Sequence, residues 1–192
     1  LFIVLPALRA LFSGTFTQAL TGAGVWQGYW RALILSYAVG AIVTLLNIVA
    51  GLPMAILIGR KKVGPLPLNI LDVLVNVPLI VPSIALGVSL SFFWKSFAFI
   101  PEIWLLIFAH LSITYPYFVR TMSATIEGVN IEFEDSARVL GARSFTIFRT
   151  ITLPLTKYSL FSGAIMMFTR SVDETGATLA VVTKLKTAPV LL

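Results

Sequence analysis

Three charged residues near the end of the chain stand in a long apolar run, where ion pairing or contact with a polar solute is the chemistry open to them. Arg170, Asp173 and Glu174 are spaced at i, i+3 and i, i+4, so a helix brings the guanidinium group within reach of both carboxylates. Charges inside a membrane are costly and usually pair with one another or line a polar cavity. Two interpretations stay open, an internal ion pair that fixes helix packing and a polar wall or gate of a translocation path. Further candidates for that path or gate are Gly176, Asn76 and Ser83.

His110 is the single histidine of the chain and lies between the apolar residues Ala109 and Leu111. A histidine in this setting is more typical of a packed, hydrogen-bonded side chain than of a ligand. A membrane-embedded enzyme that pairs His110 with Asp72 or Glu174 is an alternative, but catalytic groups must converge within hydrogen-bond reach. The sequence has no phosphate-binding Gly-Lys-Ser/Thr loop, no second histidine and no cysteine. We therefore predict no catalytic residue and no metal site.

The composition is that of an integral membrane protein. Of the 192 residues, 58% are hydrophobic and 11% are charged, whereas about a quarter of the residues in soluble domains are charged. Uncharged apolar stretches cover residues 32–59 and 103–119, and about 20 apolar residues let a helix cross a bilayer. The net charge of +6 does not indicate nucleic-acid binding, because the basic residues flank the apolar runs as the positive-inside rule predicts.

The apolar runs predict about five membrane-spanning helices in a single all-α domain over residues 1–192. The polar segment 123–157 is predicted to form a cytoplasmic loop, on the same side of the membrane as the basic stretch 60–62. The chain begins inside one apolar run and ends on two leucines, so we expect it to be truncated at both ends. Pro78 and Pro82 predict a kink or a break in the third helix. The expected helices cover residues 1–12, 32–59, 68–94, 102–122 and 158–182.

The loop 123–157 has the features of a helical elbow. Acidic residues precede basic ones, which complements a helix dipole, and Glu134 and Arg138 are placed to pair on an exposed face. Gly141 stands where the first helix is expected to stop, because glycine accepts left-handed dihedral angles at little cost. Pro154 is expected to interrupt the second helical piece close to the membrane. By these features alone, the elbow is an amphipathic connector between two spans.

The spacing of residues in the elbow resembles the loop signature of permease subunits of binding-protein-dependent type I ABC importers. That signature is Glu-Ala-Ala, three residues, Gly, nine residues, and Ile-x-Leu-Pro, and this chain matches it from Asp135 through Gly141 to Pro154. Asp135 stands where Glu is usual, and Ser136 stands where the first Ala is usual. Other stretches that resemble the family are residues 51–60, residues 77–87, and residues 174–178, the last being similar to the sulfate, molybdate and tungstate group.

The resemblance implies a transport subunit without catalytic activity, which crosses the plasma (inner) membrane of a prokaryote several times. It implies four kinds of partner: membrane lipid, a second permease subunit, a dimer of ABC ATPase subunits, and an extracytoplasmic solute-binding protein. ATP and magnesium would bind the ATPase, so no cofactor is expected in this chain. The implied solute is a small oxyanion of the sulfate, molybdate or tungstate type, with ferric iron, phosphonate and polyamines as the nearest other possibilities.

The resemblance also assigns roles to the elbow, which would rest in a cleft of the ATPase. Gly141 would be structural at that contact, because a side chain there would hold the two surfaces apart. An ATP-independent secondary transporter with Asp173 or Glu174 as its ion site is the alternative, but it leaves the elbow without a role. The residues assigned to the ATPase contact are Glu134, Asp135, Ser136, Ala137, Arg138, Gly141, Ala142, Ile151, Leu153 and Pro154.

Overall fold

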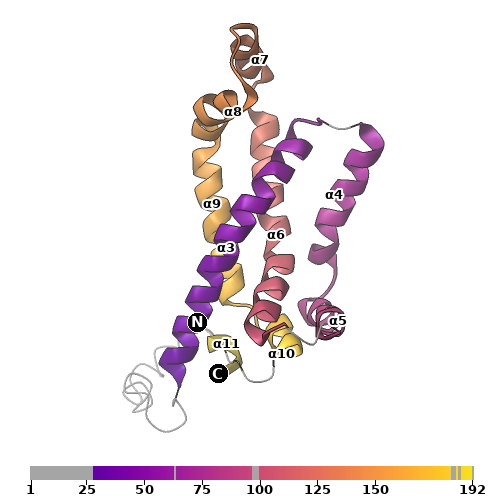
Figure 1. Ribbon diagram of the computed structural model, residues 1–192, viewed down its shortest axis with the longest axis vertical. Helices are drawn as coiled ribbons and strands as arrows, with labels where there is room; N and C mark the ends of the chain where they lie inside the picture. The colour runs from indigo at the N-terminus through magenta and orange to yellow at the C-terminus, as the bar shows by residue number, and fades with distance from the viewer. Residues whose placement is uncertain (1–27, 63, 97–99, 183–184, 186, 192) are drawn as a thin grey trace, which may run out of the picture.

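Three long helices form the body of the molecule in the computed structural model, which describes residues 28–62, 64–96, 100–182, 185 and 187–191. These helices are α3 (Tyr29–Gly59), α6 (Glu102–Gly128) and α9 (Leu153–Val172). Helix α3 packs along α6, and α9 packs against both (Figure 1). The described residues contain no strand, so the all-α prediction is confirmed. The helix expected over residues 1–12 lies outside the described residues.

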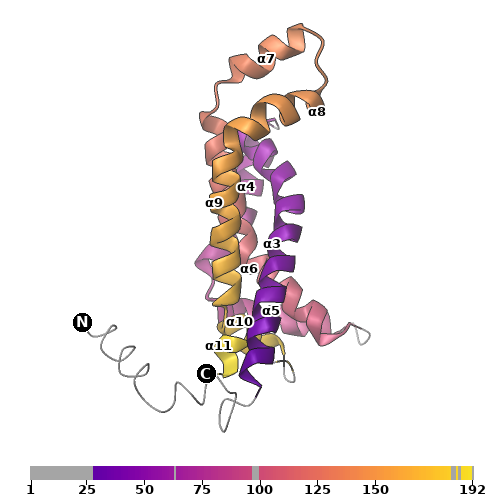
Figure 2. The same cartoon turned by 90° about the vertical axis from the view of Figure 1, so that its left-hand side faces the viewer.

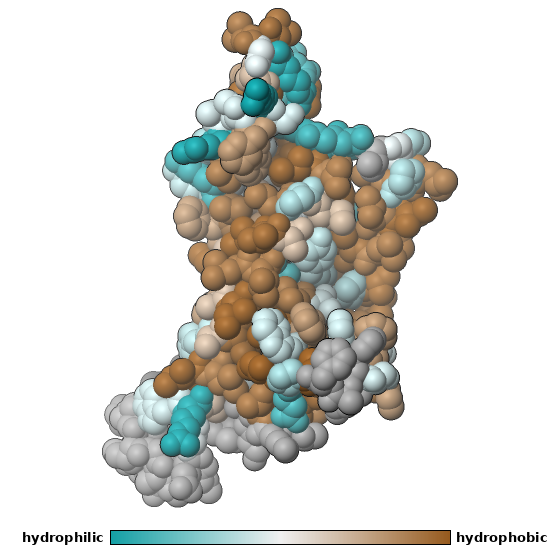
Figure 3. Space-filling view, in the orientation of Figure 1, coloured by the Kyte–Doolittle hydropathy of each residue, from teal (hydrophilic) through white to brown (hydrophobic). Residues whose placement is uncertain are grey.

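Two of these helices, α3 and α6, are long and apolar enough to cross a membrane. The bent pair α4 (Pro65–Ile80) and α5 (Ser83–Lys95) provides a third span if the two helices cross together. Helix α9 runs beside them but is more polar, because Lys157 and Arg170 lie within it. Hydrophobic residues cover much of the middle of the molecule in Figure 3, and strongly hydrophilic ones gather near the end that carries α7 and α8.

The break predicted in the third apolar run is present. Helices α4 and α5 meet at an angle of 109°, and Val81 between them is extended, with φ −81° and ψ 131°. The cause is Pro82, because the ring of a proline disfavours helical dihedral angles in the residue before it. Pro82 then opens α5, where its missing N–H group is no loss.

The single helix predicted over residues 158–182 is wrong. Helix α9 begins earlier, at Leu153, and ends at Val172, and a separate short helix, α10 (Gly176–Val181), follows it. Local capping explains the break, because the side chain of Glu174 accepts a 2.9 Å hydrogen bond from the backbone N–H of Ala177. A last short helix, α11 (Ala188–Leu191), contacts α3.

Glycines let α3 approach α6 closely. A Cβ atom on Gly51 would lie 2.7 Å from the ring of Phe118, and one on Gly59 would lie 2.7 Å from the carbonyl oxygen of Ser123. Phe118 itself is fully buried, together with Met122. Small residues at the contact are typical of helix packing in membranes, where the apolar surroundings provide little drive for association.

The elbow projects from one end of the bundle, as Figure 2 shows. It consists of α7 (Ile131–Val139), α8 (Ser144–Ile147) and a π-helical turn (Phe148–Thr152) that leads directly into α9. The basic stretch at residues 60–62 follows α3 at this same end (Figure 1). The elbow and the basic stretch thus lie at one end of the bundle, as the sequence predicts.

Candidate functional site: the elbow and the opposite end of the bundle

Helix α7 begins and ends with local caps. Asn130 caps its start, because its side-chain oxygen accepts a 3.0 Å hydrogen bond from the N–H of Glu132. At its end Gly141 has φ +83°, the N–H of Gly141 donates to the carbonyl of Arg138, and the N–H of Ala142 donates to that of Ala137. This pair of bonds is a Schellman motif. The turn predicted at Gly141 is therefore confirmed.

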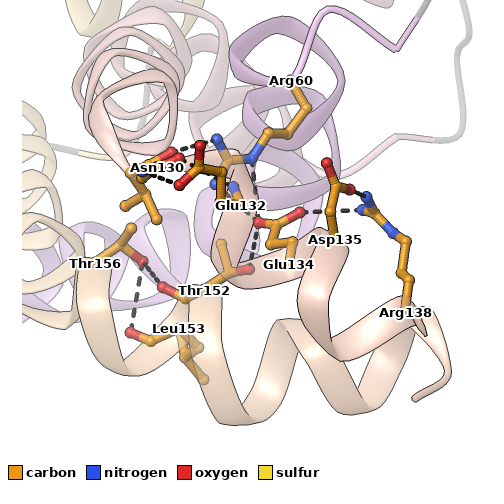
Figure 4. Close-up of polar contacts among 10 residues, drawn as sticks. Arg60, Asn130, Glu132, Glu134, Asp135, Arg138, Thr152, Leu153 and Thr156 are labelled. Atoms are coloured by element: carbon orange, nitrogen blue, oxygen red, sulfur yellow. Dashed lines mark hydrogen bonds and ion pairs between the residues drawn. The ribbon is translucent and has the colours of Figure 1, made fainter. Parts of the chain in front are cut away.

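Glu134 is the one buried side chain of α7, with 4% of its surface exposed. Its Oε1 atom accepts hydrogen bonds from Nη2 of Arg60 at 2.8 Å and from Nε of the same side chain at 3.1 Å. The hydroxyl of Thr152 donates to that oxygen at 2.8 Å, and Arg138 contacts the other carboxylate oxygen at 3.2 Å (Figure 4). The carboxylate therefore joins α7 to the end of α3 and to the π turn before α9.

These partners lower the pKa of Glu134. Burial alone raises it, since a low-dielectric environment disfavours the charged form. The hydrogen bonds from Thr152 and Arg60 and the charges of Arg60 and Arg138 outweigh burial, so the pKa lies below the usual value of 4.5. The carboxylate is therefore ionised at neutral pH.

The exposed Glu134–Arg138 face predicted from the sequence is wrong in one respect. The two side chains do pair, but Glu134 points inward, because Arg60 approaches it from a helix distant in sequence. Asp135 is the exposed acid, with a side chain 56% exposed, and it also pairs with Arg138. Of the polar residues assigned to the ATPase contact, Asp135, Ser136 and Arg138 lie on the surface, and Glu134 does not.

The prediction that Pro154 interrupts a helix is wrong. Pro154 lies in the first turn of α9, where a missing N–H group is tolerated. The irregularity comes just before it, in the π turn, where the N–H of Leu153 donates to the carbonyl of Phe148. Ile151 is partly buried in this turn, and Ala142, which lies just before α8, is also partly buried. The chain is helical without interruption from Ser144 to Val172.

Large, exposed apolar side chains of the elbow were missed by the sequence analysis. Val139 and Leu140 are each 87% exposed, Phe145 is 73% exposed and Phe133 is 55% exposed. Figure 3 shows the hydrophobic cap over α7. They could have been found in the sequence as bulky apolar residues within a polar loop, at positions that do not share a helical face with Glu134. Phe145 also borders a cavity of about 300 Å³, which is lined partly by Lys62, Arg138 and Phe148.

At the opposite end of the bundle, Arg170 and Glu174 form one of the two ion pairs that the sequence allows, with the atoms 2.6 Å apart. Glu174 is 2% exposed, whereas Asp173 is exposed and forms no ion pair with Arg170. Arg170 and Asp173 instead border a cavity of about 420 Å³ together with Tyr117 and Thr169. The expectation that Arg170 and both acids lie inside one helix is wrong, because α9 ends between them.

Two of the other path candidates lie close together, and one lies apart. A Cβ atom on Gly176 would be 2.6 Å from Oγ of Ser83, so α10 and α5 touch where these residues meet. Asn76 is in α4, where its side-chain amide donates to the backbone oxygen of Asp72 at 2.6 Å. The structure thus brings Ser83 and Gly176 to the Arg170–Glu174 end and ties Asn76 to its own helix.

His110 is a packed, hydrogen-bonded residue, as predicted. Its Nδ1 atom lies 2.9 Å from the hydroxyl of Ser171, and its Nε2 atom lies 2.9 Å from that of Thr178. Asp72, its suggested catalytic partner, pairs instead with Arg120 at 2.8 Å. Among the described residues, no group of three or more His, Asp and Glu side chains is placed to hold a metal ion.

Comparison with known proteins agrees with this architecture. Residues 51–188 match the family described as the inner membrane component of binding-protein-dependent transport systems. The chain is 32% identical over 171 residues to a molybdenum transport system permease protein of Escherichia coli, covering 81% of this chain and 73% of that protein.

Two further relatives widen the comparison. A molybdate/tungstate transport system permease protein of Pyrococcus furiosus is 31% identical over 149 residues, which are 78% of this chain and 59% of that protein. A spermidine/putrescine permease protein of Escherichia coli is 31% identical over 103 residues, 54% of this chain and 35% of that protein. All are transport permeases, so the chain is a transport subunit and not an enzyme. The chain therefore belongs to the family of inner membrane components of binding-protein-dependent transport systems.

Proposed function

We propose that this permease imports a molybdate- or tungstate-type oxyanion and that its elbow docks on a separate ATPase subunit. The observation that carries the docking proposal is the shape of the elbow, which stands clear of the bundle. It exposes Val139, Leu140 and Phe145 around the turn between α7 and α8. Exposed apolar groups of this size, ringed by charged residues, are typical of a protein-binding surface. Asp135 and Arg138 would form the polar rim of the contact, with Ser136 beside them.

The oxyanion proposal is supported by the relatives that match most of this chain, which are named for molybdenum or for molybdate and tungstate. The polyamine permease matches only about half of the chain. An extracytoplasmic binding protein would deliver the solute, and a second permease subunit would complete the path. ATP and magnesium would bind the ATPase and not this chain.

We propose that the path or gate lies at the end of the bundle opposite the elbow. Arg170, Asp173, Ser83 and Gly176 converge there, and the side chain of Arg170 is 31% exposed beside a cavity. Glu174 would hold Arg170 in place and would not contact the solute, because it is buried. Asn76 lies apart from this group and bonds to Asp72 of its own helix.

The first test is purification of the full-length protein from its native membrane in a gentle detergent, with every co-purifying chain identified by mass spectrometry. Recovery of an ATPase and a binding protein that retains molybdate would support the proposal. Repeated recovery of the permease alone, under conditions that preserve known transporter complexes, would overturn it.

The second test is Gly141→Glu. The backbone of Gly141 has φ +83°, and a Cβ atom there meets nothing within 4 Å, so the new side chain would point into open space toward the partner. We expect molybdate uptake to fall more than tenfold while the permease remains folded in the membrane. Gly28→Glu is the matched control, because Gly28 also has a positive φ, +88°, is also uncrowded, and precedes α3 at the end of the bundle away from the elbow. Wild-type uptake by Gly141→Glu would contradict the docking proposal.

A further inference from the structure

Helix α7 is attached to the bundle almost entirely through one side chain. Eight of its nine residues are partly or fully exposed, and Glu134 is the exception. Its two backbone connections are short turns, through Val129 and Asn130 on one side and residues 140–143 on the other. A force on α7 is therefore transmitted to the bundle through these two turns and through the carboxylate of Glu134.

Arg60 is the residue that receives this carboxylate. Its side chain is 5% exposed, and besides its two bonds to Glu134 it donates from Nη1 to the backbone carbonyl of Val129 at 2.7 Å. Arg60 directly follows α3, and Val129 directly follows α6. One guanidinium group thus joins the ends of two spanning helices to the elbow, with its planar fork directed at two acceptors.

The π turn supplies the second connection. Thr152 is buried at the end of this turn and donates to the same oxygen of Glu134 that Arg60 contacts. The carbonyl of Thr152 in turn accepts from the hydroxyl of Thr156 at 2.8 Å, inside α9 (Figure 4). Turns of π-helix occur mostly as single turns within α-helices and often at functional sites. Here the π turn joins α8 to α9 and presents the hydroxyl of Thr152 to Glu134 of α7.

We infer that Arg60 is the positioning residue that makes the elbow and the cytoplasmic ends of α3, α6 and α9 one rigid unit, so that movement of the elbow moves the spanning helices. This inference rests on the proposed docking of the elbow on an ATPase. A buried ion pair often contributes little net stability, and neutral side chains of similar volume can replace it without unfolding. The fixed geometry of the pair is what such a replacement removes.

The test uses the complete permease–ATPase complex in proteoliposomes, with the binding protein and molybdate, and measures molybdate transported per ATP hydrolysed. The variant is Arg60→Met/Glu134→Gln, which removes both charges together. We expect it to retain the ATPase but to transport at least fivefold less molybdate per ATP. Hydrogen exchange of the backbone amides of residues 131–139 in the same complex should be at least tenfold faster.

Lys61→Met is the matched control. Lys61 is the neighbour of Arg60 and also joins the end of α3 to α6, through Glu127 at 2.7 Å, but both side chains are mostly exposed and neither contacts the elbow. We expect Lys61→Met to stay within twofold of wild type in both measurements. Arg60→Lys is a second variant that keeps the buried charge, and with it the fold, but loses the fork. It should transport about twofold to fivefold less molybdate per ATP.

The outcomes separate this inference from the proposed function. A wild-type ratio of molybdate to ATP in the double variant, or in Arg60→Lys should the double variant not reach the membrane, overturns the role of Arg60. Equal losses in Lys61→Met also overturn it, since any contact at the end of α3 would then have the same effect. Wild-type permease that retains no ATPase overturns the proposed function itself.

Discussion

Two glutamates are buried at opposite ends of this bundle, and each pairs with an arginine. Glu134 pairs with Arg60, 74 residues away, and both side chains are almost fully buried. Glu174 pairs with Arg170, four residues away, and that arginine is 31% exposed. The first pair holds separate segments of the chain together. The second pair orders one turn of chain, where Glu174 also caps α10. Similar chemistry thus serves tertiary assembly at the elbow and local geometry at the other end.

Removal of each arginine should show this difference most strongly. Arg60→Met leaves the carboxylate of Glu134 buried and short of its main partner, which we expect to lower the free energy of unfolding by about 3–5 kcal/mol. Arg170→Met should lower it by about 1–3 kcal/mol, since Arg170 is nearer to solvent and Glu174 keeps the N–H of Ala177. Unfolding of each variant in detergent measures both values. Equal losses of unfolding free energy in the two variants would contradict the distinction between a tertiary pair and a local pair.

A second mutation tests each pair within itself. Glu134→Gln in the Arg60→Met background, and Glu174→Gln in the Arg170→Met background, remove the buried carboxylate charge that each arginine variant leaves behind. Each double variant should recover part of the lost stability. A double variant no more stable than its single parent would indicate that the charge pair is not the source of the loss.

Close helix packing at the end opposite the elbow provides the next test. A Cβ atom on Gly87 would lie 2.7 Å from Cα of Ala177 and 2.9 Å from Cβ of Ala180, so Gly87→Ala must push α5 away from α10. Overpacking of this kind costs about 1–3 kcal/mol. Gly128→Ala, with nothing within 4 Å, is the control and should avoid this overpacking. If the thermal unfolding midpoints of Gly87→Ala and Gly128→Ala are equal, α5 moves away from α10 without a measurable cost in stability.

The pH dependence of stability should identify Glu134 as an ionised partner. Its pKa in the folded protein is lowered, so its contribution is complete above the ordinary value of 4.5 and is lost as the pH falls through the folded pKa. We expect the unfolding midpoint of wild type to fall more steeply below pH 4.5 than that of Glu134→Gln. Parallel curves for the two proteins would contradict this assignment.

The smallest effect is expected at a third ion pair, between Asp72 of α4 and Arg120 of α6. The atoms are 2.8 Å apart, but the two side chains are 38% and 50% exposed. Solvent screens such pairs, and they contribute about 0–1 kcal/mol. Asp72→Asn should therefore change stability by less than about 1 kcal/mol, measured by unfolding in detergent. A loss of unfolding free energy as large as that in Arg60→Met would show that the exposure of an ion pair does not determine how much it contributes to stability.

Much of the fold was predictable because its signals are local. The apolar runs predicted α3, α6 and the interrupted pair α4–α5, with Pro82 at the break. The end of α9 was missed because Val172 lies inside a run with helical composition. Its termination depends on the capping bond of Glu174 and on His110, whose ring contacts Ser171 before the break and Thr178 after it.

The sequence by itself determined that this chain is a membrane protein, that its elbow turns at Gly141, and that Arg170 lies within reach of Asp173 and Glu174. These features depend on residue type and on spacings of a few residues, which helix geometry converts directly into contacts. Only the tertiary structure decided that Glu134 faces Arg60 and Thr152, and that Val139 and Leu140 face outward. The physical reason is that the packing of α3 against α6 and α9 sets which ends of the helices meet, and no local spacing records that arrangement.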